Sequence, residues 1–386
     1  MMEELKTNDY KLLVISADNK QVFITLSNQN TEKDALEVCE LFYKEIYRIL
    51  NQYKISIFHE RVFGSNFLYD EVCEVRCRLL KLSKNDKAFS YVDGSPVWGS
   101  GIAGINIHGI IEGNGILSDI IFNNKVYGKL WKREAVEYMI LHSVHGKQSY
   151  SFYDQTTQMF NEIIKILSDY HYEFHNIIRT WIYMDHILDQ YDEFNKARTE
   201  IFSKNKMWSS NFDETEAEEI YMPASTGIGC NNPFGCTIVA DVLAVRVKDK
   251  DKFNIISETG KDQMSAFRYG SAFSRAMVLE EEESSYIYLS GTASINEDGQ
   301  TVYHDDIDKQ INKTDSVIKT LLEIYKMNLD DICEGTVFLK KAEFLKSYQG
   351  FYEKISKELP VIITIADVCR DDLLYEMDAT FIQKNK

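Results

Sequence analysis

One pattern of strand, helix and strand occurs twice along this chain, and such a repeat constrains the fold more than any other feature of the sequence. The first copy opens with the apolar run at 138–146, and the second opens with the run at 286–295. A helix is predicted after each run, because apolar residues then recur every three or four positions. These residues are Met159, Phe160, Ile163, Ile164 and Leu167 in the first copy, and Val317, Ile318, Leu321, Leu322 and Tyr325 in the second.

Each predicted helix is followed by segments rich in β-branched and aromatic residues, which favour strands. The first of these segments are 180–184 and 336–339, and the copies close with 236–245 and 361–368. A helix that packs on a mixed sheet makes an α+β unit. We therefore predict an α+β fold with two such units in one pseudo-symmetric chain.

The N-terminal third of the chain shows the same pattern only faintly. A helix-then-strand signal spans 34–65, and its apolar face consists of Leu36, Cys39, Leu41, Phe42, Ile46 and Leu50. This signal leaves a third copy open, but the sequence favours two. We expect a divergent N-terminal α/β region at 1–137 that packs on the rest, a first unit at 138–250 and a second unit at 251–386.

Composition narrows the class of protein. The 386 residues are 44% hydrophobic and carry a net charge of −17. No cluster of Lys and Arg occurs, so we expect neither nucleic acid nor an anionic membrane as a partner. No run of about 18 apolar residues and no export signal are found. The seven cysteines are an odd number without a C-x-x-C pair, so we expect free thiols in the cytoplasm.

Several phrases of the sequence resemble known families. The order of segments in the second copy, from 289–295 through a helix that opens at Gln310 to 336–339, resembles the small α+β fold of the RidA (YjgF) family. Five longer phrases resemble, in order, chorismatases of the hydroxybenzoate-forming kind, and they lie at 179–183, 191–198, 223–229, 269–275 and 367–376. The resemblance covers roughly 149–380. Residues 265–268 depart from it, because the family pattern has a proline and an acidic residue there.

The resemblance implies two RidA-like units and a chorismatase, an enzyme that cleaves chorismate to pyruvate and a six-membered-ring carboxylic acid. Chorismate is then the small-molecule partner, and neither a cofactor nor a metal is implied. Chorismate carries two carboxylates and an enol ether. A site that cleaves it needs fixed cations, an acid that protonates the enolpyruvyl methylene, and a dry pocket.

Candidate substrate-binding residues come from the phrases that carry the resemblance. Arg198 and Arg275 are expected to bind the carboxylates, because a guanidinium matches a carboxylate with two hydrogen bonds and stays charged. Tyr269 is expected to donate a further hydrogen bond, and Gly229 to let the backbone approach the ligand. By local pattern alone, such arginines more often face solvent, and the glycine fits a loop between strands equally well.

Glu376 and Cys369 are the predicted catalytic residues. Glu376 is the expected general acid, because burial in an apolar pocket raises the pKa of a carboxyl toward neutrality. Asp378 shares its strand face, however, and two acids at this spacing more often mark a solvated face. Cys369 precedes a predicted turn at 370–372, which brings its thiol near the carboxyl. A cysteine at this position resembles that of family members that aromatise the ring.

Three other patterns are interpreted as structural. Arg179 and Trp181 alternate on one face of a predicted strand. The segment 99–104 matches G-x-G-x-x-G, but a strand is predicted after it and a dinucleotide site needs a helix. Two histidine pairs lack a third ligand at suitable spacing, and they are His142 with His145 and His171 with His175. We therefore predict no cofactor and no metal.

The sequence thus predicts a chorismatase that forms pyruvate and a hydroxybenzoate, with 3-hydroxybenzoate favoured over 4-hydroxybenzoate. Three alternatives stay open. They are hydrolysis of chorismate to a dihydroxycyclohexadienoate, a RidA-like deaminase of enamines or imines, and a non-catalytic protein that binds a small ligand. The resemblance to the RidA family implies a trimer. An internal repeat can replace contacts between subunits, however, so the sequence favours a monomer.

Overall fold

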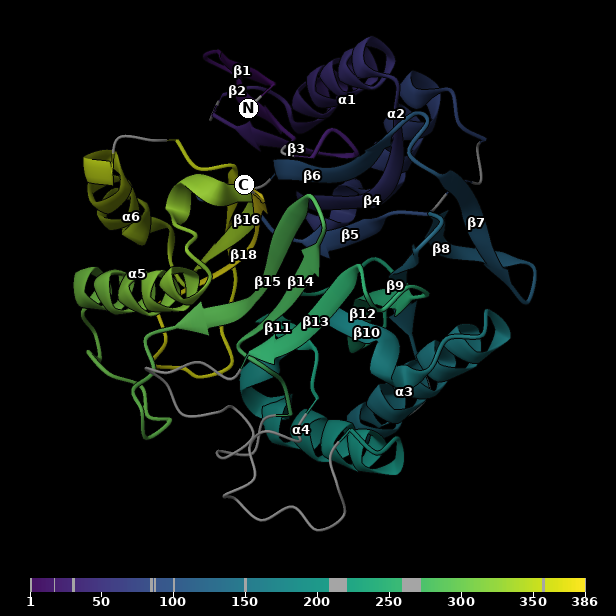
Figure 1. Ribbon diagram of the computed structural model, residues 1–386. Coiled ribbons are helices and arrows are strands. Elements are labelled where there is room, and N and C mark those ends of the chain that lie inside the picture. The colour runs from purple at the N-terminus through teal and green to yellow at the C-terminus, as the bar shows by residue number, and fades with distance from the viewer. Residues whose placement is uncertain are drawn as a thin grey trace.

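The computed structural model describes residues 2–16, 18–29, 32–83, 86, 88–99, 101–148, 151–207, 221–258, 272–355 and 358–385. Its strands form three six-stranded sheets, and each sheet comes from a different third of the chain (Figure 1). The helices lie on the outside of the three sheets. The molecule is therefore built from three units, each a sheet with helices on one face.

Within the described residues, each unit has six strands and two α-helices. The first unit contains β1 (Glu3–Lys6), β2 (Tyr10–Ile15), β3 (Gln21–Asn28), α1 (Ala35–Tyr53), β4 (Ile55–Gly64), α2 (Tyr69–Leu80), β5 (Ser90–Asp93) and β6 (Ile102–Ile111). The second contains β7 (Ile116–Phe122), β8 (Lys125–Lys132), β9 (Val136–His145), α3 (Phe152–Asp169), β10 (Ile177–Met184), α4 (Ile187–Lys204), β11 (Ala224–Gly229) and β12 (Ile238–Val247). The third contains β13 (Phe253–Glu258), β14 (Ala276–Glu281), β15 (Ser284–Ala293), α5 (Ile307–Ile324), β16 (Ile332–Leu339), α6 (Leu345–Tyr352), β17 (Val361–Ile365) and β18 (Tyr375–Lys384).

The three sheets share one topology. The strand orders are β1-β2-β3-β6-β4-β5, β7-β8-β9-β12-β10-β11 and β13-β14-β15-β18-β16-β17. In each sheet the final pair is parallel, which requires a crossover helix, and every other described pair is antiparallel. A bulge recurs near the start of the same strand, between Ile57 and His59, between Ile177 and Arg179, and between Ile332 and Glu334. The chain therefore contains three copies of one α+β unit.

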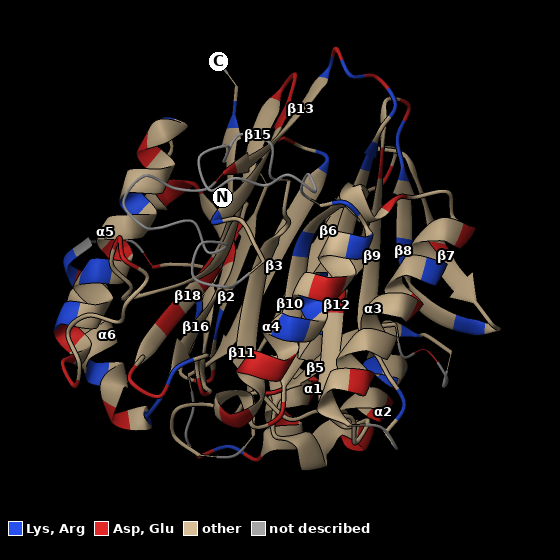
Figure 2. Cartoon of the chain, turned by 90° about the horizontal axis from the view of Figure 1, so that it is seen from below, with Lys and Arg blue, Asp and Glu red and all other residues tan. Residues whose placement is uncertain are grey.

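The long helix of each unit packs an apolar stripe onto its own sheet. In α3, buried residues such as Met159, Ile163 and Ile166 recur every three or four positions. A side-chain oxygen caps the start of α1, α3 and α5, where Asp34, Ser151 and Asp306 each accept from a backbone amide. Figure 2 shows charged residues at intervals along the helices, whereas the middles of most strands are uncharged.

The α+β class and the pseudo-symmetric units are confirmed, but the expected division of the chain needs correction. The N-terminal region is a complete unit, and the faint signal at 34–65 corresponds to α1 and β4. The boundary expected between 137 and 138 falls inside the second sheet, because β8 pairs with β9 and the unit begins with β7. The strands β7 and β8 give a weak sequence signal because both are partly exposed and carry several polar residues.

The inner faces of the three sheets meet at the centre of the molecule. One apolar cluster there joins Phe58, Trp181 and Tyr288, one residue from each unit. Three buried polar pairs link the units two by two: His59 with Asp241 at 3.3 Å, Arg61 with Glu334 at 3.5 Å, and Arg179 with Asp378 at 3.0 Å. Removing one partner of a buried ion pair costs about 3–5 kcal/mol. These pairs therefore fix the mutual arrangement of the units.

Other sequence predictions concern cysteines, glycines and membrane spans. The seven cysteines are free thiols. The glycine-rich segment 99–104 leads into β6, so the predicted strand after it is confirmed. None of the described helices is long and apolar enough to cross a bilayer.

Candidate active site

A cavity of about 260 Å³ lies between the second and third units. We call it the first cavity. Its walls come from α4 and β11 of the second unit and from β15 and β18 of the third. The structure brings together there four of the predicted site residues, Arg198, Arg275, Cys369 and Glu376.

Arg198 lies on the face of α4 that is turned toward the first cavity. Tyr191 and Asn195 line the cavity from the same helix face, because residues three or four apart share a face. The Nη2 atom of Arg198 donates to Asn195 Oδ1 at 2.7 Å. Its guanidinium carbon lies 4.6 Å from the centroid of the Phe194 ring, and only 2% of the residue is exposed. The positive charge is thus held in a defined position.

Arg275 enters the first cavity from the third unit, directly before β14. Its backbone carbonyl accepts from Ser290 N at 2.9 Å, and its amide donates to Glu258 O at 2.8 Å. The ring of Phe273 lies near both cations, at 5.7 Å from the guanidinium carbon of Arg275 and 5.6 Å from that of Arg198. Both arginines are buried. The cavity therefore presents two buried positive charges, which suit a ligand with two carboxylates. Arg370, which is half-buried, and the exposed Asp189 and Asp192 also line it.

Glu376 on β18 supplies a carboxyl group to the same cavity, and it is 5% exposed. Burial raises the pKa of Glu376 from its ordinary 4.5 to about 8, and the charge of Asp378 acts in the same direction. The charges of Arg179 and Arg275 oppose this increase. A carboxyl with this pKa is protonated at neutral pH and is able to donate its proton.

Gly291 makes room for the Glu376 side chain. A Cβ atom at Gly291 would lie 2.1 Å from Glu376 Oε1, which is far closer than atoms can approach. The glycine lies at a bulge of β15, where the pairing with β18 shifts between Leu289 and Thr292. A bulge in a strand next to a functional carboxyl lets the backbone approach it closely.

Asp378 is buried beside Glu376, so the solvated face that this spacing more often marks is absent here. Asp378 Oδ2 accepts from Arg179 Nη2 at 3.0 Å and from Thr226 Oγ1 at 2.9 Å. Burial lowers the pKa of Arg179 to about 10, and Asp378 partly offsets the decrease. The buried ion pair of Arg179 and Asp378 thus lies directly behind the acid. Arg179, interpreted from sequence as structural, also influences the pKa of Glu376.

Cys369 lines the first cavity together with Glu376. Burial raises the pKa of its thiol to about 12, and the charge of Glu376 adds to the increase. The charge of Arg370 and a hydrogen bond with Tyr191 oppose it. The thiol is therefore neutral at physiological pH, whereas a nucleophilic cysteine needs a thiolate.

Two predicted binding residues are not brought into this group. Gly229 is not among the described residues that line the first cavity, although Ser225 and Gly227 are. Its amide donates to Asp367 O at 2.8 Å and so joins the second unit to the third. Tyr269 and the segment 265–268 lie outside the described residues.

Most of the other described residues that line the first cavity were not predicted as site residues, and Tyr191, Asn195, Phe273 and Gly291 are four of them. Helical spacing from Arg198 identifies the first two, and alternation from Arg275 identifies Phe273. Gly291 carries no such signal, because its role depends on how β15 pairs with a strand more than eighty residues away.

Comparison with solved structures supports the fold. A chorismatase crystal structure matches 76% of this chain and 86% of that chain, with a TM-score of 0.58 and 18% sequence identity. The YjgF gene product of E. coli matches 33% of this chain and 99% of that chain, with a TM-score of 0.26 and 17% identity. Yeast Mmf1 matches 34% and 100%, with a TM-score of 0.28 and 18% identity. No protein-family model and no curated protein matches the sequence. The chain thus has the fold of the chorismatase structure.

Proposed function

We propose that this chain is a chorismatase, which cleaves chorismate to pyruvate and a hydroxybenzoate. One observation carries the proposal: two buried arginines and a buried carboxyl with a raised pKa line the same cavity. The fold shared with a chorismatase structure is consistent with it. We further infer that the protein is cytoplasmic and active as a monomer. A single chain already contains all three units.

Substrate binding uses the two cations. Arg198 and Arg275 each pair with one carboxylate of chorismate, and a charge-assisted hydrogen bond of this kind contributes about 1.5–3 kcal/mol. The rings of Phe194 and Phe273, which lie against the guanidinium groups, restrict their motion. Binding then positions the enolpyruvyl group near Glu376 and excludes water from the acid.

Cleavage begins when Glu376 gives its proton to the methylene carbon, which becomes a methyl group. The adjacent carbon and the ether oxygen share the resulting positive charge. The bond between the ring carbon and this oxygen then breaks, the oxygen keeps the electron pair, and pyruvate leaves. Loss of the ring proton from the carbon that bears the hydroxyl then makes the ring aromatic, restores the acid form of Glu376 and gives 4-hydroxybenzoate. 3-Hydroxybenzoate forms when this hydroxyl oxygen first bonds to the carbon that pyruvate leaves and gives its own proton to Glu376. The bond from the oxygen to its original carbon then breaks, the carbon that now carries the oxygen loses its hydrogen, and a proton returns to the oxygen, so the ring becomes aromatic. No water is consumed, so the two products together are an isomer of chorismate.

Cys369 is relevant to which ring product forms. Its neutral thiol lies in the cavity that holds the acid, and it is able to donate a weak hydrogen bond to the ring. The resemblance of this cysteine to that of ring-aromatising chorismatases supports 3-hydroxybenzoate as the product, ahead of 4-hydroxybenzoate. The competing route adds water and releases a dihydroxycyclohexadienoate.

The test mixes purified protein with chorismate and measures pyruvate by a coupled assay, while chromatography resolves the ring products. Pyruvate and hydroxybenzoate are expected with the wild-type protein and are lost with Glu376→Gln. Oxygen-18 water distinguishes the routes, because only the hydrolytic route incorporates the label into the ring acid or pyruvate at cleavage. The carbonyl oxygen of pyruvate also exchanges with water, so that exchange is measured separately. Diene acid as the sole ring product would exclude the aromatising reaction.

Other outcomes identify the alternative functions. Ammonia release from an imino acid, with chorismate left intact, would show a deaminase. Tight binding of chorismate with no pyruvate at any protein concentration would show a non-catalytic binding protein. Either result contradicts the proposed reaction.

A further inference from the structure

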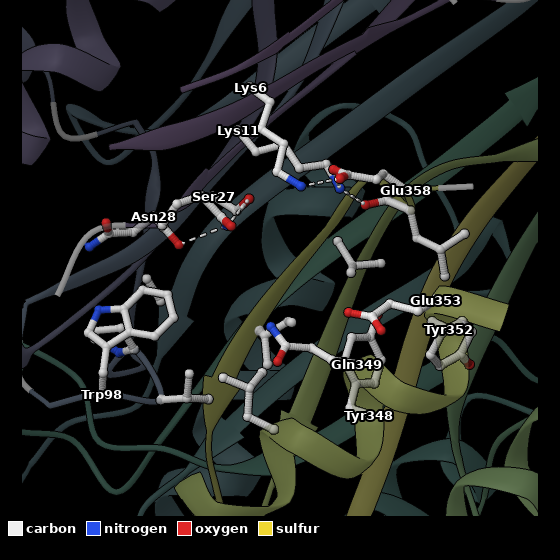
Figure 3. Close-up of a pocket in the computed structure, with 18 residues that line it drawn as sticks. Lys6, Lys11, Ser27, Asn28, Trp98, Tyr348, Gln349, Tyr352, Glu353 and Glu358 are labelled. Atoms are coloured by element: carbon white, nitrogen blue, oxygen red, sulfur yellow. Dashed lines mark hydrogen bonds and ion pairs between the residues drawn. The ribbon is translucent and has the colours of Figure 1, made fainter. Parts of the chain in front are cut away.

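A second cavity, of about 360 Å³, lies between the third and first units (Figure 3). Its lining includes Lys6, Lys11, Trp98, Tyr348 and Gln349. None of these residues lines the first cavity. The second cavity is therefore a separate site that the proposed reaction does not use.

The second cavity occupies a position equivalent to that of the first. The first is lined by the second helix and parallel edge strand of one unit, α4 and β11, and by the central strands of the next, β15 and β18. The second is lined by the corresponding elements α6 and β17, and by β3 and β6. Because the units share one topology, the same kind of space forms at both junctions.

The catalytic acid is absent from the second cavity. The position equivalent to Glu376 is found by counting from the bulge that recurs in each sheet. In the third unit, Phe338 lies four residues after the bulge residue Glu334 and pairs with Glu376. In the first unit, Phe63 lies four residues after the bulge residue His59 and pairs with Gly104, so Gly104 is the equivalent of Glu376. A Cβ at Gly104 would lie 2.5 Å from Leu26 O, so a side chain does not fit there. Among the described residues that line this cavity there is also no arginine. The second cavity is therefore suited to binding without cleavage.

A cationic cluster marks one side of the second cavity. Lys6 and Lys11 both pair with Glu358, and Lys11 Nζ lies 2.9 Å from Glu358 Oε2. Lys11 Nζ also donates to Leu359 O at 3.0 Å. The two ammonium groups and Glu358 leave one net positive charge in this cluster, and the second carboxylate of the cavity belongs to Glu353. The Lys11 side chain is only 13% exposed, and burial lowers its pKa because Glu358 offsets the desolvation only in part. One further carboxylate would balance the charge of this cluster.

Rings and an amide form the opposite side of the cavity. Figure 3 shows Trp98, Gln349 and Tyr348 across the open space from the lysines. The rings of Tyr348 and Tyr352 lie 4.7 Å apart, so they form one aromatic surface. Glu353 lines the same cavity beside Gln349 and Tyr348 (Figure 3), and its charge acts on Lys6. A flat ring that carries a single carboxylate matches both sides at once.

We propose that the second cavity is a non-catalytic binding site for a small aromatic monocarboxylate. The carboxylate binds Lys11 and Lys6, and the ring lies against Trp98 and Tyr348. Gln349 is placed to hydrogen-bond a ring substituent. This inference does not depend on the reaction proposed for the first cavity.

Benzoate is a suitable probe, and isothermal titration calorimetry of the full chain measures its binding. An Arg275→Gln background removes one of the two buried arginines of the first cavity, where Arg370 also lies, and so weakens the binding of benzoate there relative to the second cavity. Benzoate is expected to bind this variant saturably and to change the fluorescence of Trp98, and the change disappears with Trp98→Phe. Adding Lys11→Gln is expected to weaken binding by about tenfold or more, corresponding to about 1.4 kcal/mol. Lys44→Gln, which removes an exposed lysine of α1, leaves binding unchanged.

A second variant protects the test against misfolding of Lys11→Gln. Gln349 is exposed on α6, so Gln349→Phe fills the cavity without disturbing the core, and it is expected to block benzoate. Benzylamine, which has the same ring and the opposite charge, is expected not to bind. The proposal is wrong if benzoate fails to bind the Arg275→Gln variant, if benzylamine binds in its place, or if both cavity variants bind benzoate normally. Because no turnover is measured, failure here is distinguishable from failure of the proposed reaction.

Discussion

Replacing Glu376 with Gln separates the acid's effect on stability from its effect on activity. The folded state holds the Glu376 carboxyl protonated with a pKa of about 8, whereas its ordinary pKa is 4.5. Because the folded-state pKa is the higher one, this group stabilises the fold fully below about 4.5, and the contribution is lost as pH rises through about 8. Glutamine is neutral at every pH and has nearly the same shape. Glu376→Gln therefore does not lose this contribution to folding stability as the pH rises.

The size of the effect follows from the pKa difference. At about 1.36 kcal/mol for each pKa unit, the wild-type protein loses about 4 kcal/mol relative to Glu376→Gln between about pH 5 and about pH 9. Net stability of a domain is about 5–15 kcal/mol, so this difference is easily measured. The expected variant is thus inactive at neutral pH and more stable than the wild type at alkaline pH.

Urea unfolding of both proteins at the two pH values, followed by circular dichroism, tests this expectation. Glu343→Gln, at an exposed position before α6, is the matched control and should change stability by less than about 0.5 kcal/mol at either pH. If the difference in unfolding free energy between Glu376→Gln and the wild type is the same at both pH values, Glu376 is not a buried neutral acid. The proposed proton donation would then lose its basis.

Four further perturbations test the neighbourhood of the acid and the unit arrangement. Asp378→Asn removes a charge that raises the pKa of Glu376, so the alkaline limb of the pH–rate profile should move to lower pH, and an unchanged profile would contradict this. Arg275→Gln should raise KM for chorismate at least about tenfold through loss of a charge-assisted contact, and Arg275→Lys should restore binding only in part, as steady-state kinetics will show. Gly291→Ala should abolish turnover while chorismate still binds, because the added methyl group collides with the carboxyl; normal kcat would refute the close approach. Arg61→Met leaves Glu334 buried without its ion-pair partner and should cost about 3–5 kcal/mol of unfolding free energy, measured by urea titration.

Local features of this protein could be predicted from the sequence because they depend on neighbouring residues. The spacing of Met159, Ile163 and Leu167 predicts α3, and the apolar face of 34–50 matches α1. That second signal was too weak to predict the N-terminal region as a complete unit. The four residues that the structure brings into the first cavity came from the resemblance of short phrases. Helical and strand periodicity act over a few residues, so a linear chain contains them in full.

Tertiary structure alone decided that the two acids on β18 have different surroundings. Glu376 and Asp378 alternate identically along the strand, but Arg179 and Thr226 from the second unit pair with Asp378. Glu376 faces a cavity instead, so burial raises its pKa. The same holds for the edge strands β7 and β8, whose place is set by pairing with β9. Desolvation and charge pairing depend on distances between segments far apart in the chain, and only folding establishes those distances.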